Sequence, residues 1–144
     1  MAVRVRLKLR SRISGEVVET VALVSTGFET ESPQLLIPLA LARRLGLHPP
    51  PPTATIAELG TAGGPVRMFI VRDALEVWVV ASDRSVGPRV ADALISGVEE
   101  EVLINDKLVE ELGIVVVAAG SGKWRFIDDP VDKVRVTEKP QYWS

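Results

Sequence analysis

The sequence contains no cysteine and only one histidine, His48. Without cysteine there is no disulfide framework, no thiol nucleophile and no zinc site built on thiolates. A Ser–His–Asp triad would have His48 as its only base, and no Gly-x-Ser-x-Gly motif accompanies it. We interpret His48 as a loop residue, because four prolines follow it directly. We therefore expect no metal and no cofactor, and the missing thiols agree with a reducing, cytoplasmic location.

A strong net charge and long apolar runs are also lacking. The 17 lysines and arginines and the 19 aspartates and glutamates leave a net charge of −2 at pH 7, so no basic excess favours nucleic acid as a partner. No apolar run approaches the length of a membrane span, and the first residues do not resemble a signal peptide. Hydrophobic residues still make up 47% of the chain, which is enough for one packed domain over residues 1–144.

Strand patterns open the chain and recur along it. Residues 3–10 alternate apolar and basic side chains, Ser14 and Gly15 predict a turn, and residues 16–24 predict the returning strand. Similar patterns predict further short strands at residues 53–58, 66–71, 74–81, 90–96, 114–118, 124–127 and 134–136.

Two short helices are predicted between these strands. The first covers residues 39–45, and Gly46 is placed as its C-terminal cap. The second covers residues 106–112 and begins after Asn105, whose side chain suits an N-cap. Many short strands and few helical residues indicate a mostly β domain, either a small closed barrel or an orthogonal sandwich, with one or two short helices.

Charged residues form two runs. The first strand places five basic side chains on one face: Arg4, Arg6, Lys8, Arg10 and Arg12. This face is either a nucleic-acid-binding stripe or the solvated outer face of an antiparallel strand, and the lack of a basic excess favours the solvated face. The second run, residues 99–101, consists of three glutamates, and we interpret it as a solvated turn because consecutive side chains do not converge on one ion.

Three segments, taken in their order and spacing, carry a resemblance to a known family. They are residues 21–27 (Val-Ala-Leu-Val-Ser-Thr-Gly), residues 35–38 (Leu-Leu-Ile-Pro) and residues 41–47 (Leu-Ala-Arg-Arg-Leu-Gly-Leu). Together they resemble the retropepsin-like aspartic proteases of the prokaryotic single-domain type. In that family an apolar strand runs into Asp-Thr-Gly, and a later helix often ends in Leu-Gly-Leu.

The resemblance extends along most of the chain. Residues 102–114 are similar to the family's second apolar segment and helix, with Asn105 at or beside a position that is commonly glycine. Residues 58–66 are similar to the flap hairpin that closes over substrate. The resemblance implies a single retropepsin-like domain over residues 1–144, built as a closed barrel of the acid-protease type.

Ser25 stands where the family has its catalytic aspartate, and Thr26 and Gly27 complete the motif. The family's reaction uses two carboxylates that share a proton, so that one activates water while the other donates. A serine hydroxyl supplies neither the charge nor the acidity for this step. The roles of the threonine and the glycine are architectural, so we expect the scaffold without the chemistry and assign no catalytic residue.

The resemblance also implies an assembly and a ligand site. One such loop per chain makes half of a two-fold site, so a complete cleft would need a homodimer. Our leading hypothesis is a proteolytically inactive retropepsin-like homodimer that binds an extended peptide, or another ligand such as a protein segment, in a flap-covered cleft. The candidate ligand-binding residues are Ser25, Gly27, Glu29, Glu58, Gly60, Gly63 and Gly64.

Other functions stay open at this point. An active aspartic-type peptidase could use Glu29 as a substitute acid, or Ser25 could be an engineered replacement of a native aspartate. A β domain that binds nucleic acid or a protein partner through the basic first strand is a further alternative. Neither nucleic acid nor a membrane is an expected partner under the leading hypothesis.

Overall fold

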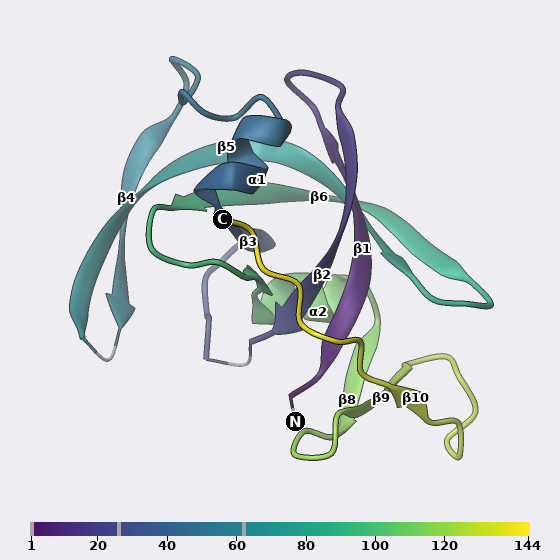
Figure 1. The fold of residues 1–144 in the computed structure, drawn as a ribbon. Helices are drawn as coiled ribbons and strands as arrows, with labels where there is room; N and C mark the ends of the chain where they lie inside the picture. The colour runs from purple at the N-terminus through teal and green to yellow at the C-terminus, as the bar shows by residue number, and fades with distance from the viewer. Residues whose placement is uncertain (1, 26, 62) are drawn as a thin grey trace.

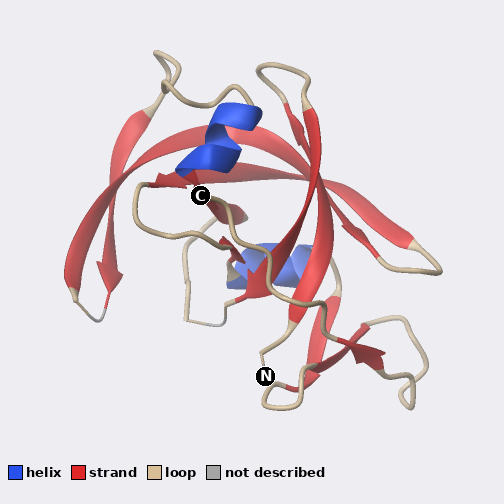
Figure 2. Cartoon of the chain, viewed as in Figure 1, coloured by secondary structure: helices blue, strands red, loops and turns tan. Residues whose placement is uncertain are grey.

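The computed structural model describes residues 2–25, 27–61 and 63–144 of the chain (Figure 1). Strands take up 50% of it and two short helices 9%, which confirms the expected mostly β fold (Figure 2). Within the described ranges the elements follow one another as β1 (Arg4–Ser11), β2 (Val17–Val24), β3 (Gln34–Pro38), α1 (Leu39–Arg44), β4 (Thr55–Thr61), β5 (Gly64–Val80), β6 (Ser85–Ser96), β7 (Val102–Ile104), α2 (Asp106–Glu111), β8 (Ile114–Ala118), β9 (Lys123–Phe126) and β10 (Arg135–Val136).

Six strands close into a barrel. In the order β1-β2-β7-β3-β6-β5 each strand pairs with the next, and β5 also pairs with β1, which completes the ring. The pairs β2–β7 and β3–β6 are parallel, and the other pairs of the ring are antiparallel. β4 pairs with β5 outside the ring, so these two strands form a hairpin that projects to the left of the barrel in Figure 1. The closed barrel, one of the two architectures that the sequence predicts, is therefore the observed one.

The ring closes because β5 changes its partner along its length. Residues 64–70 pair with β4, whereas residues 75–79 pair with β1. Between these stretches Asp73 adopts a φ of 49°, and the register against β6 shifts. Such a bulge bends a strand and increases its twist, which lets one strand serve both the hairpin and the barrel.

The predicted break in this strand is wrong. The sequence predicts separate strands at residues 66–71 and 74–81, but the structure has one continuous strand. Arg72 and Asp73 are exposed at the bulge, so they interrupt the apolar alternation while the pairing with β6 resumes on the far side. A bulge and a loop have the same local sequence pattern, and only the pairing with β6 distinguishes them.

β6 begins at Ser85, five residues before the predicted start at residue 90. The Gly87–Pro88 pair inside it is a typical turn sequence, which hides the first part of the strand. Gly87 has a φ of 142°, and a Cβ atom there would lie 2.6 Å from the carbonyl oxygen of Val77. Glycine is required because the backbone of β5 passes so close.

The barrel interior is filled by the apolar face of the first strand. Val5, Leu7 and Leu9 are fully buried, as their alternation with basic residues predicts. The two helices cover the barrel with Leu41 of α1 and Leu108 of α2, both inaccessible to solvent. Burial of these side chains is the main favourable contribution to the stability of the fold.

A second, three-stranded sheet of order β10-β9-β8 follows the barrel. Trp124 and Phe126 of β9 are buried in the main core, with their rings 5.0 Å apart in an edge-to-face arrangement. Arg135 of β10 donates to Asp129 at 2.9 Å and to Asp83 of the β5–β6 turn at 2.6 Å. The ion pair with Asp83 attaches the second sheet to the turn between β5 and β6, and the pair with Asp129 joins β10 to the β9–β10 loop.

The pH dependence of stability tests how much the ion pair between Asp129 and Arg135 contributes to the fold. The hydrogen bond from Arg135 lowers the pKa of Asp129 from 3.8 to about 2. The group therefore stabilises the fold fully at a pH above its unfolded pKa, and this contribution is lost as the pH falls toward 2. We expect Asp129→Asn to lower the free energy of unfolding at neutral pH, with a deficit that shrinks below about pH 4.

Urea unfolding of both proteins across this pH range measures the deficit. Asp132→Asn is the matched control, since Asp132 is exposed and has no ion pair within the described structure. A deficit of equal size at every pH would contradict the assignment.

Candidate functional site

The loop that begins at Ser25 lies between the ends of two parallel strands. β2 pairs in parallel with β7, with Val24 opposite Ile104, so both strands end at the same edge of the barrel. The backbone N–H of Ser25 donates to the carbonyl of Ile104 at 3.1 Å, and the N–H of Asp106 donates to the carbonyl of Phe28 at 3.2 Å. Residues 25 and 27–33, here called the Ser25 loop, are thereby held against the start of α2.

Asn105 fastens this loop with a single buried amide. Its Oδ1 accepts from the N–H of Gln34 and from the N–H of Leu108, both at 3.0 Å. Its Nδ2 donates to Thr30 Oγ1 at 2.7 Å and to the carbonyl of Ser32 at 2.9 Å. The predicted N-cap of α2 is confirmed, and the same side chain also fixes the Ser25 loop, which the sequence did not indicate.

Asp92 of β6 joins the other end of the loop to the bulge in β5. Burial acts to raise the pKa of this carboxyl, but hydrogen bonds outweigh it and hold the pKa below its usual value. The donors are the N–H of Asp73, Ser32 Oγ, the Arg72 guanidinium and the Gln34 amide, at 2.8–3.3 Å. The ionised carboxylate therefore connects the loop, β6 and the bend of β5.

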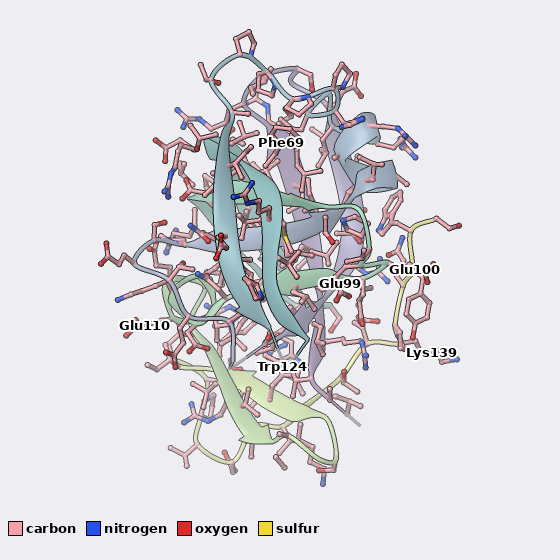
Figure 3. The ribbon with its side chains drawn as sticks, turned by 90° about the vertical axis from the view of Figure 1, so that its left-hand side faces the viewer. Phe69, Glu99, Glu100, Glu110, Trp124 and Lys139 are labelled. Carbon is pink, nitrogen blue, oxygen red and sulfur yellow. The ribbon has the colours of Figure 1, made fainter. Side chains whose placement is uncertain are left out.

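A groove of about 540 Å³ lies between the Ser25 loop, the β4–β5 hairpin and the β6–β7 loop of residues 97–101, here called the wall loop. Its apolar lining comes from several strands and from both loops: Phe28, Leu36, Leu59, Val66, Met68, Val98 and Leu103. Ser25 and two carboxylates, Glu29 and Glu99, supply its polar side chains. Figure 3 shows Glu99 on the wall loop beside the hairpin, which faces the viewer.

The structure brings four of the predicted ligand-binding residues to this groove. Ser25, Gly27, Glu29 and Gly60 line it. Glu58 is not in the lining; it is exposed on the hairpin, 4.0 Å from Nε of Arg67.

Two further predicted residues, Gly63 and Gly64, lie at the turn between β4 and β5. Gly63 and Gly64 are not among the residues that line the groove, and Gly64 has a φ of 108° at the start of β5. Thr26 lies outside the described residues.

The wall loop is the part of the site that sequence reasoning missed. The sequence predicts a solvated turn for its three glutamates, but in the structure they lie in different surroundings. Glu99 lines the groove, Glu101 forms an ion pair with Arg4, and the carbonyl of Glu100 accepts from the N–H of Trp143 at 2.7 Å. Ser96 shapes the start of the loop, because its Oγ accepts from the N–H groups of residues 98 and 99.

Residues near the C-terminal end support the wall loop. The Trp143 indole donates to Thr20 Oγ1 at 2.9 Å, and Gln141 Oε1 accepts from the N–H of Val21 at 3.1 Å. Val98 and Glu99 border both the groove and a second pocket, of about 210 Å³, which Trp143 also lines. The wall loop therefore lies between the groove and the end of the chain.

Among the described residues, no imidazole or carboxylate is hydrogen-bonded to the Ser25 hydroxyl. The one histidine, His48, lines a different pocket of about 290 Å³ together with Phe69 and Ile95. In Figure 3 Phe69 marks the upper part of the hairpin, away from the wall loop. A serine hydroxyl without a neighbouring base is a hydrogen-bonding group and not an activated nucleophile.

The basic face of β1 carries its own counter-charges. Arg10 pairs with Glu76 at 2.8 Å, Arg6 lies 3.9 Å from Glu138, and Lys8 lies over an indole ring 4.3 Å from its centroid. A face with matched charges attracts phosphates weakly, so the structure does not favour nucleic-acid binding here.

No protein-family model matches the sequence, and comparison with curated proteins finds no significant relative. Among the described residues, no helix combines the length and the apolar character needed to cross a bilayer. Within the same residues, no group of three or more His, Asp or Glu side chains is placed to hold a metal ion.

Removal of the Asn105 amide tests how strongly the Ser25 loop depends on it. Asn105→Ala leaves the N–H groups of Gln34 and Leu108 without their partner and removes the N-cap of α2. We expect the free energy of unfolding to fall by about 2–4 kcal/mol in urea unfolding. The control Glu110→Ala, on the exposed side of the same helix, is expected to change it by less than about 0.5 kcal/mol. A loss for Asn105→Ala no larger than the control's would contradict this role.

Proposed function

We propose that this chain is a retropepsin-like domain without proteolytic chemistry that binds an extended peptide in the groove beneath the β4–β5 hairpin. The groove is the observation that carries the proposal. Ser25 lines it directly after β2, and Leu59 and Val66 reach it from the two strands of the hairpin. The strand β2 that precedes Ser-Thr-Gly in the sequence, the hairpin and the later strand–helix unit have the order that the family resemblance implies.

An extended peptide suits the groove because the lining is mostly apolar and strands surround it. β4 is last in the order of strands, so its outer edge has no strand neighbour among the described residues. Strand edges offer main-chain N–H and carbonyl groups to an added peptide, and pockets select its alternate side chains. A peptide in this groove would find both kinds of contact.

Hydrolysis is not expected, because the position of the family's carboxylate holds a hydroxyl. Ser25 is half-buried; its backbone N–H donates to the carbonyl of Ile104, and its carbonyl accepts from the N–H of Phe28. A neutral alcohol cannot share a proton with a partner carboxylate and cannot activate water at neutral pH. The groove therefore keeps a binding shape without a proton-transfer pair at Ser25.

The proposal includes a homodimer. The chain has one Ser-Thr-Gly loop, and two copies related by a two-fold axis would place two Ser25 residues at the centre of a shared cleft. Residues from both copies would then contact one peptide.

Sedimentation equilibrium tests the assembly. We expect a species of twice the 15.6 kDa chain mass, with dissociation on dilution if the association is weak. A single 15.6 kDa species at every concentration up to about 100 μM would overturn the dimer.

A peptide library tests the absence of catalysis. The protein incubated with a diverse peptide pool between about pH 4 and pH 7 is expected to produce no fragments by mass spectrometry while it retains a subset of peptides in pull-down. Cleavage that pepstatin inhibits would overturn the proposal and support an active aspartic-type peptidase.

Two variants separate the possible sources of any cleavage. Ser25→Ala would abolish it if the hydroxyl were a nucleophile, and Glu29→Gln would abolish it if Glu29 were a substitute acid. Under the proposal neither variant changes the fragment pattern, because there is none, and Ser25→Ala keeps peptide binding within about threefold.

A further inference from the structure

The groove combines an apolar lining with charge of one sign. Among the described residues that line it, the ionisable ones are two carboxylates, Glu29 on the Ser25 loop and Glu99 on the wall loop. No lysine, arginine or histidine is part of the described lining. The two carboxylates lie on two different loops that border the groove, so the negative charge is not confined to one side of it.

Neither carboxylate has a cationic partner in the described part of the chain. Three other carboxylates of the barrel strands and the wall loop are paired: Glu101 with Arg4, Glu76 with Arg10, and Asp92 with Arg72. Glu29 and Glu99 form no such pair, although both border apolar surface. The sequence neighbours Glu31 and Glu100 have the same sign and add to the negative potential.

A ligand with positive charge would supply the missing partner. Exposed carboxylates hold a cation weakly in water, but a bound ligand displaces water from the groove and lowers the local dielectric constant. Charge complementarity of this kind sets the choice of partner and the association rate more than the total affinity. Acidic peptides and nucleic acids would instead bring like charges together.

We infer that the groove takes an extended peptide that combines apolar side chains with a lysine or arginine directed to Glu29 and Glu99. The apolar side chains would contact Leu36, Met68 and Leu103, which line the same groove. The inference rests on the proposed peptide-binding function and specifies the chemistry of its ligand.

Three peptides of equal length and identical apolar pattern test the inference. They carry blocked termini, a fluorescent label and a central Lys, Gln or Glu, and their binding to the full chain is measured by fluorescence anisotropy. We expect the Lys peptide to bind about tenfold more tightly than the Gln peptide, and the Glu peptide to bind most weakly. In about 0.5 M salt the preference for Lys is expected to fall severalfold.

Charge-removing variants locate the effect. Glu29→Gln and Glu99→Gln are each expected to reduce the preference for Lys over Gln about threefold. Glu110→Gln is the matched control, because Glu110 is exposed on α2, on the opposite side of the view from Glu99 in Figure 3, and does not line the groove. This variant is expected to keep the full preference.

The outcomes separate this inference from the function on which it rests. Equal binding of the three peptides, or tightest binding of the Glu peptide, would overturn the charge preference and leave peptide binding intact. A preference for Lys that survives in both Glu29→Gln and Glu99→Gln would also overturn it. Failure of all three peptides to bind at up to about 1 mM would overturn the peptide-binding function itself.

Discussion

Parallel pairing of β2 with β7 brings the Ser25 loop and the start of α2 to the same edge of the barrel, and the groove depends on that contact. The contact is stabilised by one buried amide, because the Asn105 side chain is hydrogen-bonded both to the Ser25 loop, through Thr30, and to the first turn of α2, through the N–H of Leu108. It also accepts from the N–H of Gln34 at the start of β3. Buried polar groups without partners are costly, so the amide and the backbone groups that it satisfies must form together. The position of Ser25 relative to the hairpin follows from this constraint.

Local features of the fold could be predicted from the sequence because local physics determines them. The alternation in residues 3–10 places Leu7 in the core. The N-cap at Asn105 favours the start of a helix independently of the tertiary contacts. The continuous strand β5 could not be predicted in this way. Its bulge at Asp73 is stabilised by Asp92, nineteen residues further along the chain, so no local window contains the cause.

Part of the candidate site could also be predicted, and the reason is the same. Ser25, Gly27 and Glu29 belong to one loop whose motif is local, and Gly60 is found through the hairpin pattern. Glu99 could not be found, because a run of glutamates has the pattern of any solvated turn. Its place in the groove results from the parallel pairing of β3 with β6, which brings the wall loop toward the Ser25 loop.

The contact between Trp143 and the wall loop has a consequence for folding during synthesis, because the two segments leave the ribosome at different times. The wall loop rests against this residue, which hydrogen-bonds to it and to Thr20. A ribosome releases the Ser25 loop and the hairpin long before it releases residue 143. The nascent chain can therefore form most of the barrel while one side of the groove still lacks its support. A ligand that needs the complete groove meets it only when Trp143 has left the exit tunnel.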